Sequence, residues 1–160
     1  MNAIDPSVIV DDATGKWWMH YGSFFGGLYC VELNSETGLT VNEGDLGHLT
    51  ARRAHYRKDN LEAPEIIYHP GLKQYYLFTS YDPLMTTYNL RVSRSEAAEG
   101  PFTDYFGKAV KDTTNNFPIL TAPYRFENHP GWAGTAHCGV FSDGEGNYYC
   151  LLYTSDAADE

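Results

Sequence analysis

Residues 61–82 read LEAPEIIYHPGLKQYYLFTSYD, and this pattern decides the fold of the chain. A polar residue stands near its head, a short apolar run follows, the chain turns at glycine, and an aromatic run returns. Two further stretches repeat the pattern, IDPSVIVDDATGKWWMHYG at residues 4–22 and TAHCGVFSDGEGNYYCLLYT at residues 135–154. A supersecondary unit that recurs along a chain is typical of propellers, solenoids and other repeat arrays.

The returning runs, residues 16–21 and 75–81, alternate between two faces, and this period of two predicts β-strands. The apolar runs before each turn are short and continuous, as expected for strands covered on both faces. No amphipathic helix is indicated, so the chain is expected to be all-β. Additional strands are expected at residues 28–33 and 89–93, with fourth strands near 46–52 and 102–106.

A β-propeller needs about four to eight blades, each a four-stranded sheet around a central channel. The chain has 160 residues, which is enough for two units of blade size and the start of a third. We therefore expect residues 1–153 to be a partial β-propeller catalytic domain. Residues 154–160 (TSDAADE) depart from the pattern and are expected to be a non-native tail.

Composition narrows the range of partners. The net charge is −10, with 21 acidic and 11 basic residues, and this excludes nucleic acid as an expected partner because polyanions bind to positive surfaces. Aromatic residues make up 15% of the chain. They fit either the filling of pleated sheets or stacking on sugars. The three cysteines have no CxxC spacing, so neither a disulfide framework nor a zinc site is indicated.

When the returning aromatic runs of the three units are aligned, one polar residue heads each unit: Asp5, Glu62 and His137. The inner strands of propeller blades begin at the same rim, so these heads are expected to converge. Paired carboxylates in one cleft are the machinery of glycoside hydrolysis. Glu65 is a competing candidate, although strand alternation should turn it to the face opposite Glu62.

Each head also has a structural alternative. Asp5 precedes proline and fits a turn at a strand entrance, and Glu62 fits an exposed loop carboxylate. His137 fits a hydrogen-bonded core or rim histidine. The repeat pattern alone leaves these alternatives open.

Five motifs make the chain similar to glycoside hydrolase family 43, and to endo-arabinanases within it. In order, they are residues 2–7 (NAIDPS), 21–27 (YGSFFGG), 62–64 (EAP), 88–95 (YNLRVSRS) and 100–102 (GPF). The resemblance runs from residue 2 to about residue 153. It implies a five-bladed β-propeller, of which this chain covers about two blades and part of a third. It also implies hydrolysis with inversion of configuration at the anomeric carbon.

The resemblance also implies roles for individual residues. Glu62 matches the general acid, and Asp5 matches the aspartate that modulates the pKa of that acid and orients it. Asn2 and Ser23 match positions near the substrate cleft. His137 matches a histidine directed toward a central metal, often calcium, although its neighbours Cys138 and Gly139 depart from the family pattern. The family's general base is a first-blade aspartate that this chain does not contain, so the chain alone is expected to be inactive.

The sequence therefore predicts part of an inverting hydrolase of α-1,5-arabinan, a plant cell-wall polysaccharide. The alternatives are an exo-acting α-L-arabinofuranosidase or β-xylosidase of the same family, and a non-catalytic sugar-binding propeller. By resemblance the complete protein is expected to be secreted or periplasmic, although no signal peptide is visible, and no membrane partner is expected. A protein-binding WD-repeat scaffold is disfavoured because its tryptophan–aspartate signature is absent.

Overall fold

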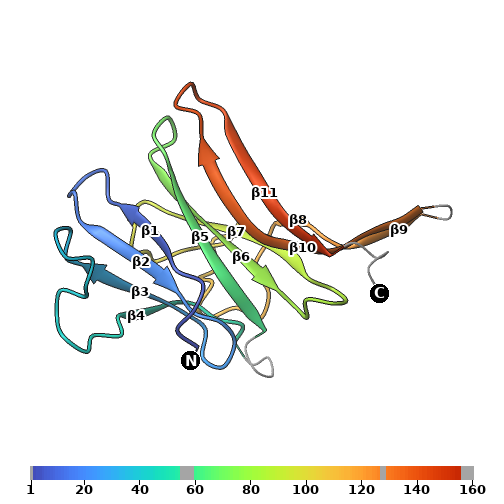
Figure 1. The fold of residues 1–160 in the computed structure, drawn as a ribbon, viewed down its shortest axis with the longest axis horizontal. Coiled ribbons are helices and arrows are strands. Elements are labelled where there is room, and N and C mark those ends of the chain that lie inside the picture. The colour runs from blue at the N-terminus through green and yellow to red at the C-terminus, as the bar shows by residue number, and fades with distance from the viewer. Residues whose placement is uncertain (1, 55–59, 127–128, 156–160) are drawn as a thin grey trace.

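A computed structural model describes residues 2–54, 60–126 and 129–155, and within these ranges every regular element is a β-strand (Figure 1). The prediction of an all-β chain is confirmed. No helix in the described ranges is long and apolar enough to cross a membrane. The strands are β1 (Ser7–Val10), β2 (Trp17–Tyr21), β3 (Leu28–Leu33), β4 (His48–Ala51), β5 (Leu61–His69), β6 (Gln74–Tyr81), β7 (Asn89–Ser95), β8 (Ile119–Thr121), β9 (Tyr124–Phe126), β10 (His129–Ser142) and β11 (Tyr148–Ser155).

The first unit is an antiparallel sheet of four strands in the order β1-β2-β3-β4. Its strands match the predicted ones, including the fourth strand near residues 46–52. The predicted alternation of β2 is also observed. Trp17, Met19 and Tyr21 pack with residues of β3 on one face, while Trp18 packs against the core shared with the second unit.

The second unit runs β5-β6-β7, with β8 on the outer edge of β7. The fourth strand predicted near residues 102–106 is wrong. In that segment Thr103 forms only isolated bridges, to Arg94 and to Ala109. The chain passes through a loop and returns at Ile119 and Thr121 to pair with Arg91 and Leu90.

The third unit consists of β10 and β11, with β9 pairing the first part of β10. A single parallel contact, Thr135 with Asn89, joins β10 to β7. In Figure 1, β9 and the beginning of β10 project as an arm away from the three units. β11 continues to Ser155, two residues into the expected tail, and residues 156–160 lie outside the described ranges.

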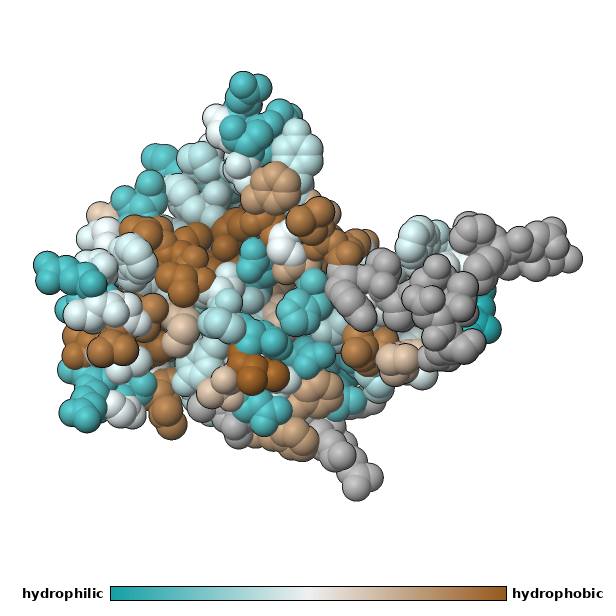
Figure 2. All heavy atoms as spheres, in the orientation of Figure 1, coloured by the Kyte–Doolittle hydropathy of each residue, from teal (hydrophilic) through white to brown (hydrophobic). Residues whose placement is uncertain are grey.

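The units pack face to face through apolar residues, as blades do. One core lies between the first and second units and includes Leu28, Leu61, Leu77 and Phe102, each at most 1% exposed. A second core joins the second and third units and includes Tyr88, Leu90 and Ala136. Figure 2 shows apolar side chains across the middle of one face, over β1 and β11, where Val8, Val10 and Leu151 are exposed.

Candidate functional site

A residue in the left-handed backbone region lies just before β1 and within β5 and β10, the inner strands of the three units. These residues are Asp5 (φ 56°), Ala63 (φ 51°) and His137 (φ 52°). In β5 and β10 they coincide with bulges, between Glu62 and Glu65 and between Ala136 and Cys138. Non-glycine residues in this region are strained and cluster at functional sites. The three blades thus share one local device, which redirects the side chains at their common rim.

The strand register corrects the alignment of the heads. Ile9 pairs with Trp18, Ile67 with Tyr76 and Phe141 with Tyr149, so the returning aromatics are equivalent as predicted. Counting back four residues from each inner-strand partner reaches Asp5, Ala63 and His137. Glu62 therefore lies one residue before the equivalent position, and its prediction as the exact counterpart of Asp5 is wrong. Sequence spacing could not separate this offset from a difference in turn length.

Glu62, the second residue of β5, is held at both carboxylate oxygens. Ser23 Oγ donates to Oε2 at 2.9 Å, and the Tyr88 hydroxyl donates to Oε1 at 2.8 Å. Ser23 and Tyr88 are 2% and 1% exposed, so both donors come from the buried side. Burial, and then the neighbouring carboxylate, raise the pKa of the Tyr88 phenol above its ordinary value. The phenol of Tyr88 is therefore neutral near pH 7 and can donate its hydrogen to Glu62.

Electrostatic coupling joins Asp5 to the other two predicted residues. The pKa of Asp5 is raised, chiefly because the carboxyl is partly buried, and the negative charge of Glu62 raises it further. The charge of His137 and a hydrogen bond from the Ala63 backbone act in the opposite direction. Glu62 and His137 are distant from Asp5 in sequence but are close enough to influence the charge of its carboxyl.

A small polar cavity of about 70 Å³ lies beside these residues. Its lining includes Asp5, just before β1, Ala63 and Glu65 of β5, and His137 of β10. A larger cavity of about 530 Å³ lies at the opposite end of the second blade, beside Gln74 and Arg94.

The metal that the resemblance implies is not supported by the donor groups present. In the described part of the chain no group of three or more His, Cys, Asp or Glu side chains could hold a metal ion. Calcium takes about six to eight oxygen ligands, and the imidazole of His137 offers none. Its backbone N–H donates to Ser80 Oγ at 2.8 Å, while its side chain is exposed. His137 as a metal ligand stays a prediction, and no chemical step is derived through a metal.

Glu65 lies on the same face as Glu62, so its predicted orientation is wrong. Glu62 pairs with Ser80 and Glu65 with Phe78, and these partners are two residues apart on one face of β6. The bulge between the two glutamates supplies the extra residue. Glu65 accepts hydrogen bonds from Ser7 Oγ at 2.7 Å and from the Val140 backbone N–H at 3.0 Å. It therefore links the inner strands of all three blades.

The two residues predicted near the substrate cleft differ in exposure. The backbone of Ser23 forms isolated bridges with Asn2 and with Glu62, so the three lie side by side. Asn2 is exposed. Ser23 is buried, and its hydroxyl donates to Glu62. A direct contact between this hydroxyl and a sugar is therefore less favoured than the sequence suggested.

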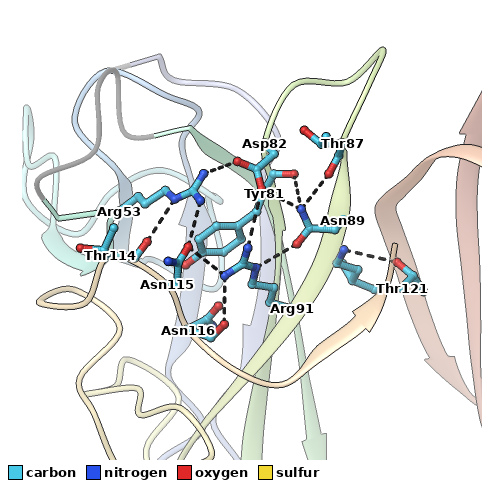
Figure 3. Close-up of polar contacts among 11 residues, drawn as sticks. Arg53, Tyr81, Asp82, Thr87, Asn89, Arg91, Thr114, Asn115, Asn116 and Thr121 are labelled. Atoms are coloured by element: carbon cyan, nitrogen blue, oxygen red, sulfur yellow. Dashed lines mark hydrogen bonds and ion pairs between the residues drawn. The ribbon is translucent and has the colours of Figure 1, made fainter. Parts of the chain in front are cut away.

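A buried polar network anchors the loop that carries Tyr88 (Figure 3). Asp82, at the start of this loop, forms ion pairs with Arg53 and Arg91. Asn89, at its end, donates from Nδ2 to Asp82 and to the backbone carbonyls of Tyr81 and Thr87. The guanidinium of Arg91 lies 4.3 Å from the centre of the Tyr81 ring. Both ends of the loop are thereby fixed beside Glu62.

Sequence reasoning assigned no role to Tyr88, although its motif was among those that carried the resemblance. The available signal was its position directly before a strand that returns from the same rim. A propensity pattern cannot say that this phenol reaches a residue 26 positions earlier in the chain.

The sequence model of glycosyl hydrolases family 43 matches residues 1–159. The chain belongs to this family. An extracellular endo-α-(1→5)-L-arabinanase of Thermotoga petrophila is 36% identical over 122 residues, which are 75% of this chain and 25% of that protein. An extracellular exo-α-(1→5)-L-arabinofuranosidase of Cellvibrio japonicus is 29% identical over 169 residues, with coverage of 99% and 46%.

Solved structures of family 43 arabinanases agree with the fold of this chain. The endo-1,5-α-L-arabinanase from Thermotoga petrophila superposes with a TM-score of 0.85 at 30% identity, over 96% of this family 43 chain and 37% of that one. An α-L-arabinanase of Cellvibrio cellulosa, solved in complex with arabinohexaose, gives 0.80 at 30% identity, over 99% and 50%. The predicted five-bladed propeller family is confirmed. The chain spans between a quarter and a half of these relatives.

Proposed function

We propose that this chain forms part of an inverting glycosidase that cleaves α-1,5-linked arabinan. The observation that carries the proposal is the setting of Glu62. Its two oxygens accept hydrogen bonds from Ser23 and Tyr88, on a rim shared with Asp5 and His137. Relatives named endo-arabinanases support the choice of substrate.

In this mechanism Glu62 is the general acid. It gives its proton to the leaving glycosidic oxygen as the bond from that oxygen to the anomeric carbon breaks. A water attacks the opposite face of the sugar and loses a proton to a general base, so the configuration inverts. No residue of this chain is assigned as that base. The negative charge of Asp5 favours the protonated form of the acid, and Asp5 orients it.

The remaining residues position these groups. Ser23 and Tyr88 act through Glu62, whereas exposed Asn2 is the residue of the Asn2–Ser23–Glu62 row that can meet a sugar hydroxyl. His137 places its imidazole at the rim beside Asp5, where its charge opposes that of the carboxylates.

The test uses Glu62→Gln in a complete five-bladed propeller that contains this sequence. Cleavage of linear arabinan should fall roughly 10³-fold, because the leaving oxygen needs a proton. An aryl arabinofuranoside with an activated leaving group should lose far less, because its departure needs little protonation. Glu32→Gln is a matched control, since Glu32 is a partly exposed carboxylate of β3 that forms an ion pair with Lys16. Equal losses on both substrates would remove Glu62 from the acid role.

An exo-acting enzyme of the same family is the second candidate, because the Cellvibrio japonicus relative that covers nearly all of this chain is named an exo-arabinofuranosidase. The products released from linear arabinan distinguish the endo-acting from the exo-acting enzyme. An endo-acting enzyme releases a ladder of oligosaccharides from linear arabinan at early times, whereas an exo-acting enzyme releases one short product from chain ends. A non-catalytic sugar-binding propeller would bind arabinan and release neither.

We also propose that the complete protein acts outside the cytoplasm. Three of the curated relatives, from Thermotoga petrophila, Bacillus subtilis and Cellvibrio japonicus, are named extracellular. A polymeric cell-wall substrate fits such a location. Recovery of the complete protein from culture medium or periplasm tests this assignment.

A further inference from the structure

A groove lined by exposed aromatic residues runs along the rim beside Tyr88. Its volume is about 350 Å³, which falls within the usual size of ligand sites. One wall is the loop between β6 and β7, through Met85 and Thr86. The other wall is the β9–β10 arm, through Tyr124, Arg125 and Trp132. From this groove we infer a subsite that binds a segment of the arabinan chain outside the cleaved bond, an inference that rests on the proposed function.

The backbone of the β9–β10 arm fixes the position of Trp132. Trp132 and Tyr124 are cross-strand partners, and a bulge lies between His129 and Trp132. Gly131 occupies this bulge at φ +79°, and a Cβ there would lie 1.7 Å from the Tyr124 carbonyl oxygen. Only glycine permits this close approach of the two strands. The bulge presents both rings at the groove, where Trp132 is 46% and Tyr124 is 40% exposed.

Both walls are anchored to the second blade. Thr121 of β8 donates its hydroxyl hydrogen to the Thr135 carbonyl oxygen, which ties the arm to this blade. Asn89 Nδ2 donates a hydrogen bond to the Thr87 carbonyl oxygen and thereby fixes the end of the loop between β6 and β7. Met85 is three residues from Tyr88, so their Cα atoms lie within about 11 Å of each other. A polymer held at Glu62 reaches the groove within a few sugar units.

The chemistry of the groove suits a neutral sugar chain. Rings of Trp and Tyr offer apolar faces for the C–H faces of furanose units and keep a polar edge. Thr86 and Arg125 supply groups that can bond hydroxyls. The net charge of −10 disfavours a polyanion as the occupant. An arabinanase with a similar fold has been solved with arabinohexaose, a chain long enough to extend beyond one bond.

Trp132→Ala in a complete propeller containing this sequence tests the subsite. The KM for linear arabinan should rise roughly tenfold. Calorimetric affinity for arabinohexaose, measured with Glu62→Gln also present to stop turnover, should weaken by a similar factor. Turnover of an aryl arabinofuranoside should be unchanged, because that substrate occupies only the cleavage site. Trp132→Phe keeps a ring and should retain most of the affinity, which guards against misfolding as the cause.

Phe141→Ala is the matched control. Phe141 is an aromatic of similar exposure on the same strand, about 30 Å away along β10. It should leave both measurements unchanged. If the parent protein cleaves arabinan and Trp132→Ala behaves like the control, the subsite is refuted and the proposed function stands. If the parent protein does not cleave arabinan but arabinohexaose binding depends on Trp132, the proposed activity fails and the subsite stands. If it neither cleaves nor binds, both fail.

Discussion

The hydroxyl of Tyr88 lies 2.8 Å from Oε1 of Glu62 and donates a hydrogen bond to it. Ser23 occupies the other oxygen. Both donors are buried, so the carboxylate of the proposed acid is held at each oxygen by a hydroxyl from the buried side of the blade.

Tyr88→Phe should test this positioning contact in a complete propeller. Without the phenol, Oε1 of Glu62 loses its hydrogen-bond donor, so kcat on linear arabinan should fall roughly tenfold. KM should stay unchanged, because the ring that remains keeps its packing. Initial rates over a range of arabinan concentrations measure both constants. Tyr105→Phe, at an exposed ring, is the control. A kcat equal to that of the control would reduce Tyr88 to a packing residue.

Asp5 gives a test that does not depend on activity. Because Glu62 raises the pKa of Asp5 and His137 lowers it, two neutralising variants should act in opposite directions. Glu62→Gln should lower the pKa of Asp5, and His137→Gln should raise it. A carbon-detected NMR titration of the Asp5 carboxyl measures both.

Asp143 is the internal reference for that titration. It lies in the turn between β10 and β11, where hydrogen bonds from Asn147 and Glu145 keep its pKa below the ordinary value. Its titration should be the same in both variants. Shifts of Asp5 in the same direction, or none, would mean that the three side chains do not share a site.

Much of the fold followed from the sequence because its signals are local. Alternation in residues 16–21 and 75–81 gave β2 and β6, and the glycine turns placed the hairpins. The fourth strand of the second blade was misplaced because its pairing depends on tertiary structure. Ile119 returns to Arg91 after a long connection that carries no periodic pattern.

The site was predicted less completely, for a specific physical reason. A residue with a left-handed backbone conformation inside a strand changes the face on which the following side chains lie. The sequence Glu62-Ala63-Pro64-Glu65 contains no residue type that predicts this conformation. Strand alternation therefore predicted the wrong face for Glu65. The repeat aligned Asp5 with Glu62, whereas the structural equivalent of Asp5 is Ala63, the next residue. The family resemblance supplied the proposed role of Glu62, because a sequence motif identifies a position directly and does not depend on strand periodicity.

Glu65 should contribute to stability by linking three blades. Glu65→Ala leaves Ser7 Oγ and the Val140 N–H without their acceptor, at a cost of about 3 kcal/mol in the free energy of unfolding. Glu65→Gln keeps one acceptor oxygen and should cost about 1 kcal/mol. Urea unfolding measures both. Glu32→Ala removes a solvent-exposed ion pair with Lys16 and should cost less than about 1 kcal/mol. A Glu65→Ala cost no larger than that of Glu32→Ala would contradict the linking role.

His20 should make stability depend on pH. Its imidazole is fully buried and lies 2.9 Å from the Ala98 carbonyl oxygen through Nε2. Burial lowers its pKa to about 4 from an ordinary value of 6.5. Because the folded pKa is the lower one, the unfolded chain binds more protons between these values. The contribution of His20 is therefore fully present above about pH 6.5 and is lost as pH falls toward 4, by about 3 kcal/mol in total.

The urea midpoint of the chain, measured from pH 7 to pH 4, tests this prediction. The difference between the parent chain and His20→Gln should grow smaller as pH falls, because the glutamine cannot take up the proton that opposes folding. His48→Gln is the matched control, since His48 also places Nε2 2.9 Å from a backbone carbonyl oxygen, that of Glu99, but is exposed. It should keep the pH slope of the parent chain. A parallel pH dependence in all three proteins would show that His20 does not titrate in this range.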